Sequence, residues 1–118
     1  MESVELAKAA AAILDKKKAV DIKAIRTEEV TLVSDYFLIA SGTSTTHTKS
    51  LAEELEYELG KLGVMPDHIE GRATGWILLD YGTVLVHVFE QEQRAYYNLE
   101  RLWADAEELD LSDIITED

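Results

Sequence analysis

The chain has 118 residues and a mass of 13.2 kDa, a size that indicates one domain. Its 47% hydrophobic content can form a core without disulfides or a structural metal, and it contains no cysteine. With 11 Lys and Arg residues against 24 Asp and Glu residues, the formal net charge is -13. This charge argues against direct binding of nucleic acid and favours a basic protein partner.

The N-terminal segment has no targeting character. Residues 1–14 contain Glu2 and Glu5 and lack the basic stretch and apolar core of a signal peptide. No uninterrupted apolar run approaches the roughly 20 residues that span a bilayer. Together with the absence of cysteine, these features predict a cytoplasmic protein that has no membrane partner.

The first half of the chain predicts a helix, two strands and a second helix. Apolar residues at helical spacing predict a helix over residues 3–18, and alternating apolar residues predict a half-buried strand over 20–25. The run at 36–40, introduced by Val30, Leu32 and Val33, is typical of a central strand. Hydroxyl residues at 43–46 can cap the second helix, which ends near Gly63 and Pro66. Its apolar face is formed by Leu51, Leu55, Leu59 and Leu62.

The second half predicts a β-hairpin over residues 76–89, a third helix over 91–105, and an acidic C-terminal tail over 106–118. There are seven acids and no base between residues 104 and 118. This order of elements predicts a single α/β domain over residues 1–105, with a mixed β-sheet flanked by helices in two or three layers.

The hairpin has two chemically different faces. With the turn centred on Tyr81 and Gly82, Trp76 lies opposite His87 and Leu78 lies opposite Leu85. One face is purely aliphatic, which predicts core: Ile77, Leu79, Val84, Val86 and Val88. The other mixes large apolar and polar groups: Trp76, Leu78, Asp80, Thr83, Leu85, His87 and Phe89. This second face is either a protein interface or a surface covered by a further helix.

Catalytic and metal-binding patterns are weak. The histidines at 47, 68 and 87 are too far apart in sequence to form a metal-ligand motif, so we expect no metal or cofactor. Gly42, Thr43 and Ser44 lie between a strand and a helix, where a phosphate-binding loop can occur, but helix capping explains Ser44 equally well. Nucleotidyltransferases follow such a loop with two carboxylates on a strand, and Asp80 stands alone here. An enzyme of that class is therefore disfavoured.

The ordered motifs of this chain resemble the ribosomal silencing factor family, RsfS or Iojap, also labelled DUF143. The resemblance runs from the first helix to Trp103. It is carried by residues 35–44 (DYFLIASGTS), His47, Glu70-Gly71, residues 76–82 (WILLDYG), residues 84–89 (VLVHVF) and residues 97–103 (YNLERLW).

The resemblance implies a nucleotidyltransferase-like α/β topology without the enzyme's carboxylates, and a protein that is not an enzyme. Members of the family bind large-subunit ribosomal protein number fourteen and sterically block joining of the small subunit, which represses translation. Homodimers also occur in the family. Two alternatives stay open: a nucleotide-binding or nucleotidyltransferase-like enzyme that uses the loop at Gly42 to Ser44, and a homodimeric scaffold without a ribosomal role.

The resemblance also implies where the partner binds. Its hairpin tryptophan corresponds to Trp76, expected to be the apolar anchor, and its following acid corresponds to Asp80, expected to pair with Lys or Arg of the ribosomal protein. Leu78, Glu70 and Tyr81 are added as partner-binding residues because they lie near this motif. The alternative for Trp76 is a purely structural role in the core.

Overall fold

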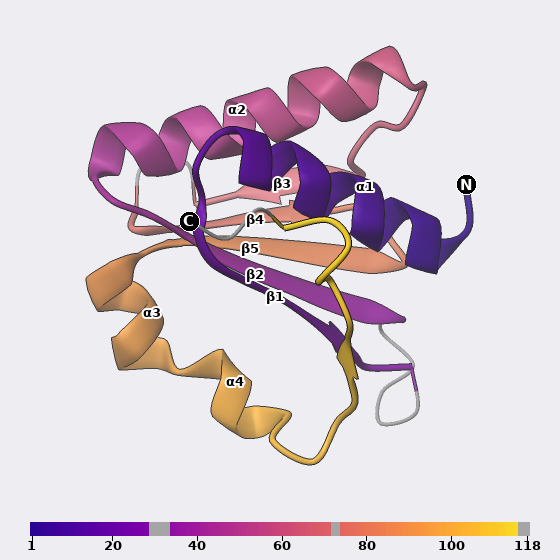
Figure 1. The fold of residues 1–118 in the computed structure, drawn as a ribbon. Coiled ribbons are helices and arrows are strands. Elements are labelled where there is room, and N and C mark those ends of the chain that lie inside the picture. Colours follow the sequence, from indigo (N-terminus) through magenta and orange to yellow (C-terminus); the bar gives the residue numbers. More distant parts are fainter. Residues whose placement is uncertain (29–33, 72–73, 116–118) are drawn as a thin grey trace.

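A mixed β-sheet lies between two layers of helices (Figure 1). The computed structural model describes residues 1–28, 34–71 and 74–115. Within these residues the strands form one six-stranded sheet in the order β3-β4-β5-β2-β1-β6, in which β2 and β5 are parallel and the other neighbours are antiparallel. The strands are β1 (Val20–Arg26), β2 (Tyr36–Gly42), β3 (His68–Glu70), β4 (Trp76–Asp80), β5 (Val84–Glu90) and β6 (Glu108–Leu109). The expected single α/β domain with a mixed sheet is confirmed.

Helices α1 (Ser3–Lys16) and α2 (Thr45–Lys61) cover one side of the sheet, and α3 (Gln91–Tyr97) and α4 (Leu99–Leu102) cover part of the other (Figure 1). The main core lies under α1 and α2. It includes Ala7, Ala10 and Ala11, whose short side chains let α1 approach the sheet closely, and the aliphatic face of the hairpin. The predicted core positions Ile77, Leu79, Val84, Val86 and Val88 are all buried here.

The start of α2 is fixed by side-chain hydrogen bonds. The hydroxyl of Ser44 accepts a hydrogen bond from the backbone N–H of His47 at 3.0 Å, so the predicted capping role is confirmed. His47 Nδ1 accepts a hydrogen bond from the backbone N–H of Thr43 at 2.9 Å, and its Nε2 lies 2.8 Å from the carbonyl oxygen of Lys17. With Nδ1 as acceptor, Nε2 carries the proton and donates a hydrogen bond to the carbonyl oxygen of Lys17. His47 therefore ties the end of α1 to the start of α2.

Two predicted helix boundaries and one residue of a predicted apolar face were wrong. Helix α1 ends at Lys16 because Lys18 adopts a left-handed backbone conformation, with φ at 67°. Leu62 lies just past the end of α2 and is exposed, unlike the buried Leu51, Leu55 and Leu59. The third helix is interrupted by Asn98, whose φ of 46° separates α3 from α4. Val30, Leu32 and Val33 lie outside the described residues.

The hairpin register differs from the prediction by two residues. Trp76 pairs with Phe89, not His87, and Leu78 pairs with His87. The turn comes later because Gly82 adopts a φ of 82° and donates its N–H to Oδ1 of Asp80 at 2.8 Å. A shift of two residues leaves each side chain on its face, so the two-face assignment is confirmed.

The described part of the C-terminal segment, residues 106–115, packs on the domain. Its strand β6 pairs with β1, so that Ala24 lies opposite Leu109. Leu111 is 7% exposed within the main core, and Ile114 and Ile115 pack against that core. The apolar residues of this acidic segment thus contribute to the same unit as the sheet.

Candidate partner-binding surface

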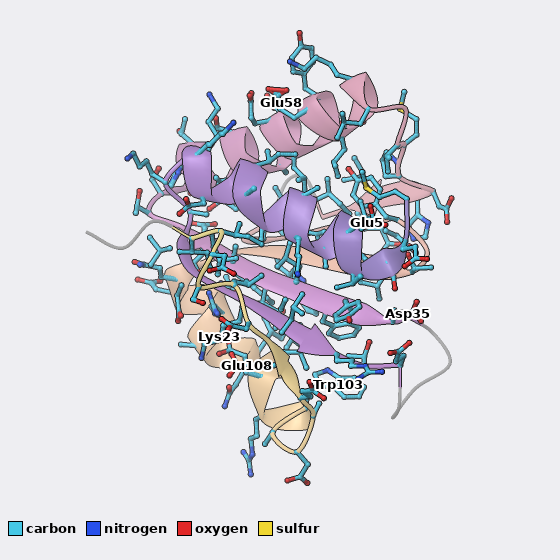
Figure 2. The ribbon with its side chains drawn as sticks, turned by 45° about the vertical axis from the view of Figure 1, so that its right-hand side comes forward. Glu5, Lys23, Asp35, Glu58, Trp103 and Glu108 are labelled. Carbon is cyan, nitrogen blue, oxygen red and sulfur yellow. The ribbon has the colours of Figure 1, made fainter. Side chains whose placement is uncertain are left out.

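The side of the sheet that faces α3 and α4 has a covered half and an open half. Over β1, β2 and β5, a second core of Ile25, Ile39 and Phe89 is covered by Leu99, Trp103 and Ala106. Figure 2 shows Trp103 on the side of the sheet away from α1. Phe37 bridges the covered half, with ring centroids 4.8 Å from His87 and 5.2 Å from Trp103. The expectation that a further helix covers the second hairpin face is therefore met for one half of it, and the other half is left uncovered by helices.

The open half lies on β3, β4 and the adjoining part of β5. The strand register places one set of side chains together there: His68, Glu70, Trp76, Leu78, Asp80 and Leu85. All six are exposed or half-buried, and we call them the edge surface. Four of the five predicted site residues, Glu70, Trp76, Leu78 and Asp80, belong to it. An apolar centre is here combined with carboxylates, as in many protein-binding surfaces.

Trp76 lies at the border between the two halves. Its indole Nε1 donates a hydrogen bond to Nδ1 of His87 at 3.0 Å. Its ring stacks on Phe89 at 5.1 Å and contacts Tyr97 of α3 at 4.7 Å between centroids. The indole is thus held from inside by the second core while the residue keeps a half-exposed surface.

His87 is the buried polar group beneath Trp76. Burial lowers its pKa to about 4, so the imidazole is neutral at pH 7. Since Nδ1 accepts from Trp76, the imidazole proton resides on Nε2, which has no hydrogen-bond partner among the described residues. A neutral acceptor of this kind fixes the orientation of the indole.

Asp80 combines a structural and an exposed role. One carboxylate oxygen accepts the hydrogen bond from Gly82 that shapes the turn, and the other lies 3.4 Å from Nε2 of His68. The same His68 nitrogen lies 3.4 Å from a carboxylate oxygen of Glu70. His68 was not predicted as a site residue. It is brought here by the pairing of β3 with β4, which a three-residue strand after an irregular loop does not reveal in sequence.

Tyr81 lies apart from the edge surface. Its side chain is 9% exposed and belongs to the main core under α1 and α2. Burial raises its pKa to about 12, and its hydroxyl has no hydrogen-bond partner among the described residues. We therefore leave Tyr81 out of the contact surface proposed below.

The loop at Gly42 to Ser44 serves the fold. A Cβ on Gly42 would collide with Oγ1 of Thr48 and lie 2.7 Å from the Thr48 backbone nitrogen, so glycine permits the close approach of α2 to β2. The Ser44 hydroxyl and the Thr43 N–H are already used by His47. An open pocket of about 210 Å³ beside this loop is also lined by Glu90 and Glu92, whose carboxylates would repel a phosphate.

The described parts of the chain contain neither a metal-binding cluster nor a membrane-spanning helix. Within residues 1–28, 34–71 and 74–115, no group of three or more His, Asp or Glu side chains is placed to hold a metal ion. Among the helices of these same residues, none is both long and apolar enough to cross a bilayer.

The fold and the edge surface define a small mixed α/β domain with a half-buried tryptophan, Trp76, beside its open sheet face. All of its residues, 1–118, match the family described as "Ribosomal silencing factor during starvation" (RsfS). The chain belongs to this family, which confirms the resemblance noted in its sequence.

Relatives match over nearly the whole chain. It is 42% identical over 112 residues to the ribosomal silencing factor RsfS of Bacillus subtilis, covering 94% of this chain and 95% of that protein. It is 38% identical over 117 residues to the RsfS of Halalkalibacterium halodurans, covering 98% and 100%. A crystal structure of a Chromobacterium violaceum protein superposes with a TM-score of 0.85 at 34% identity, covering 88% of each chain. Family membership confirms the expectation of a translation regulator that is not an enzyme.

Proposed function

We propose that this protein binds large-subunit ribosomal protein number fourteen and thereby blocks association of the ribosomal subunits. Family membership supports association with the large subunit. The net charge of -13 supports a basic protein as the direct contact, since ribosomal RNA would repel so acidic a chain. The resulting repression of translation would be steric, so it would depend on affinity and concentration and not on turnover.

The half-exposed Trp76 on the edge surface is the observation that carries this proposal. An aromatic side chain held from beneath by Phe89 and His87 loses little conformational freedom on binding, which is typical of interface hot spots. Leu78 and Leu85 extend the apolar area beside it. Asp80 and Glu70 supply negative charge at its rim, where Lys or Arg of the partner would pair.

The finer expectations from the resemblance form part of this proposal. The nucleotidyltransferase-like topology is compatible with a mixed sheet carrying helices on both sides. A cytoplasmic location follows from a ribosomal partner in a bacterial cell, the kind of cell that supplies the two RsfS relatives. If the protein forms homodimers through the edge surface, dimer formation and ribosome binding would compete.

Binding of purified large subunits to the protein tests the proposal, with subunit joining as the functional readout. Trp76→Ala should weaken binding by about 2 kcal/mol, or roughly 30-fold, because it removes the apolar anchor. Tyr57→Ala is a matched control, since Tyr57 is an exposed aromatic on α2, on the opposite side of the sheet. Asp80→Asn removes the charge while keeping the oxygen that accepts from Gly82, and it should weaken binding less.

Inhibition of subunit joining should follow these affinities and need no nucleotide. If Trp76→Ala bound as tightly as the parent protein, the proposed surface would be wrong. The rival function predicts metal-dependent nucleotide binding in calorimetry that is lost in Ser44→Ala. Stable dimers without any binding to large subunits would instead favour the scaffold.

A further inference from the structure

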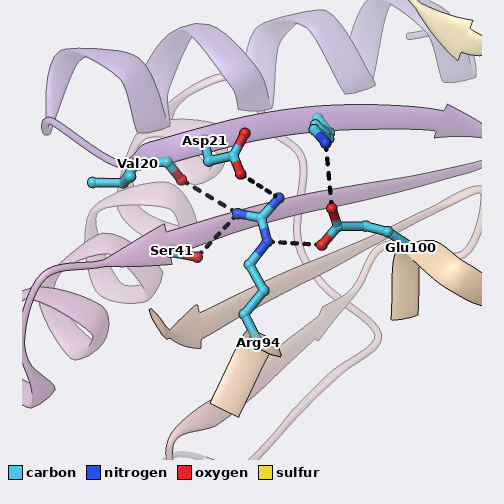
Figure 3. A network of polar contacts seen from close by, with 6 residues as sticks. Val20, Asp21, Ser41, Arg94 and Glu100 are labelled. Carbon is cyan, nitrogen blue, oxygen red and sulfur yellow. Dashed lines mark hydrogen bonds and ion pairs between the residues drawn. The ribbon is translucent and has the colours of Figure 1, made fainter. Parts of the chain in front are cut away.

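Arg94 is a nearly buried cation on α3, with 9% of its side chain exposed. Its Nε donates to Oε1 of Glu100 at 2.9 Å and its Nη1 donates to Oγ of Ser41 at 3.0 Å (Figure 3). Nη1 also lies 3.4 Å from the carbonyl oxygen of Val20, and Nη2 lies 3.6 Å from Oδ2 of Asp21. One guanidinium group thus connects α3 with α4, β1 and β2.

The backbone is bent on both sides of this guanidinium group. Asp21 has a φ of 53° where the pairing of β1 with β2 is irregular, and Asn98 has a φ of 46° between α3 and α4. Side-chain-bearing residues rarely adopt such conformations. Because of these two bends, Asp21 of β1 and Glu100 of α4 can both approach Arg94. Lys23 then lies 3.4 Å from the second oxygen of Glu100 and completes the network.

The contacts of Arg94 attach α3 to the sheet. Of the residues of α3 (Gln91–Tyr97), all of which the structure describes, Arg94 is the only buried one. The helix therefore lacks the apolar stripe that usually fixes an amphipathic helix. Its attachment depends instead on the polar contacts of Arg94 and on the ring of Tyr97.

Tyr97 follows Arg94 by three positions and reaches the binding surface. Its ring centroid lies 4.7 Å from that of the Trp76 indole, and the residue is 46% exposed. Phe89 contacts the same indole within the second core, and Tyr97 contacts it from α3. The position of α3 therefore determines where the Tyr97 ring contacts the indole of Trp76.

We propose that Arg94 is a positioning residue for partner binding, which holds α3 so that Tyr97 keeps the indole of Trp76 in its binding orientation. This inference rests on the proposed function, because it assigns Arg94 a role at the same surface. It predicts that removing the charge of Arg94 changes the affinity for the partner in the direction opposite to the one expected from electrostatics alone. Loss of a positive charge should favour binding of a basic partner, whereas loss of positioning should weaken it.

The test compares Arg94→Gln with Arg101→Gln, which removes the same charge from an exposed position on α4. We expect Arg94→Gln to weaken binding to large subunits about fivefold or more, and Arg101→Gln to leave it unchanged or tighten it. Arg94→Lys keeps the charge but not the forked geometry, so it should restore binding only in part. In NMR spectra of the free protein, the indole N–H signal of Trp76 should shift or broaden in Arg94→Gln and stay at the parent position in Arg101→Gln.

A second, milder variant keeps the test decisive if Arg94→Gln does not fold. Glu100→Gln weakens the contact with Arg94 without emptying a buried site, and exposed Glu92→Gln on α3 is its charge-matched control. We expect Glu100→Gln to weaken binding more than Glu92→Gln and to move the Trp76 signal in the same direction as Arg94→Lys. Parent-like binding and an unmoved Trp76 signal in both Glu100→Gln and Arg94→Lys would overturn the inference. If the parent protein bound no large subunits while these variants moved the Trp76 signal, the proposed function would fail and the positioning of Trp76 by Arg94 would stand.

Discussion

The indole N–H of Trp76 donates a hydrogen bond to Nδ1 of His87 at 3.0 Å, from one strand of the hairpin to the next. This contact joins a half-buried candidate for partner binding to a buried imidazole. The imidazole can accept the hydrogen bond only while Nδ1 is unprotonated. The state of His87 therefore affects both the stability of the domain and the orientation of Trp76.

Acid should destabilise the protein through His87. Burial lowers the pKa of His87 from 6.5 to about 4, so between these values the unfolded chain binds a proton that the folded protein does not. The stability that this neutral imidazole contributes is fully present above pH 6.5 and is lost as the pH falls toward 4. The loss should be on the order of 3 kcal/mol. Urea unfolding of the parent and of His87→Gln, at about pH 7 and about pH 4.5, measures it.

The pH effect should be specific to the buried histidine. His87→Gln should lose clearly less stability than the parent over this range, because it removes the imidazole whose pKa burial lowers. An equal loss in His87→Gln and the parent would contradict the assignment and would attribute the effect to carboxylates alone.

Tyr81→Phe should stabilise the domain and leave partner binding intact. The Tyr81 hydroxyl is buried without a hydrogen-bond partner among the described residues, so its removal should raise the free energy of unfolding by about 1 kcal/mol. Denaturant unfolding and binding to large subunits measure the two effects. A clear loss of binding would return Tyr81 to the contact surface.

Gly42→Ala should destabilise the protein because the new Cβ would collide with Thr48 at the start of α2. A loss of about 2 to 3 kcal/mol is expected from such overpacking. Gly60→Ala is the control, since its Cβ would meet only ordinary contacts 3.8 Å away on Met65. That change within α2 should stabilise by about 0.5 to 1 kcal/mol. Thermal unfolding of both variants decides whether Gly42 serves close packing.

Removal of residues 106–118 should destabilise the domain, because Leu111 and strand β6 would be lost with them. Leu111→Ala alone should cost about 2 to 3 kcal/mol. If the chain ending at residue 105 unfolded at the parent denaturant concentration, the C-terminal segment would be dispensable for the core.

Added salt should weaken binding to large subunits only modestly. It screens the pairing of Asp80 and Glu70 with a basic partner, but it also screens the repulsion between this acidic chain and ribosomal RNA. Between about 50 and 200 mM salt, we expect the dissociation constant to change less than about tenfold. A loss of about a thousandfold, as for phosphate-binding proteins, would contradict the proposed contact.

Residue alternation predicted the faces of the sheet better than it predicted the register. The hairpin shifted by two residues and kept Trp76, Leu78 and Asp80 together, because the side-chain period of a strand is also two. The same alternation places Tyr81 with Ile77 and Leu79 on the core side, so its inclusion among the contact residues followed proximity in sequence and not geometry. The alternation pattern thus predicted a core position for Tyr81, whereas its nearness to the hairpin motif had suggested a contact residue.

Other features depend on contacts between distant segments. The break at Asn98 depends on a single backbone conformation that asparagine tolerates but does not require. His68 joins the edge surface through a short edge strand, and Arg94 finds its partners on β1, β2 and α4. None of these arrangements has a local periodicity, which is why helical and strand patterns could not predict them.

The pairing of β1 with β6 has a consequence for how the protein is made. Strand β1 emerges from the ribosome long before β6 is synthesised, so one edge of the growing sheet has no neighbouring strand during that interval. An unpaired edge is a template for association with other nascent chains. The hydrophobic core is likewise incomplete until Leu111 has left the exit tunnel. Completion of this domain therefore requires that β6 and Leu111 have been synthesised.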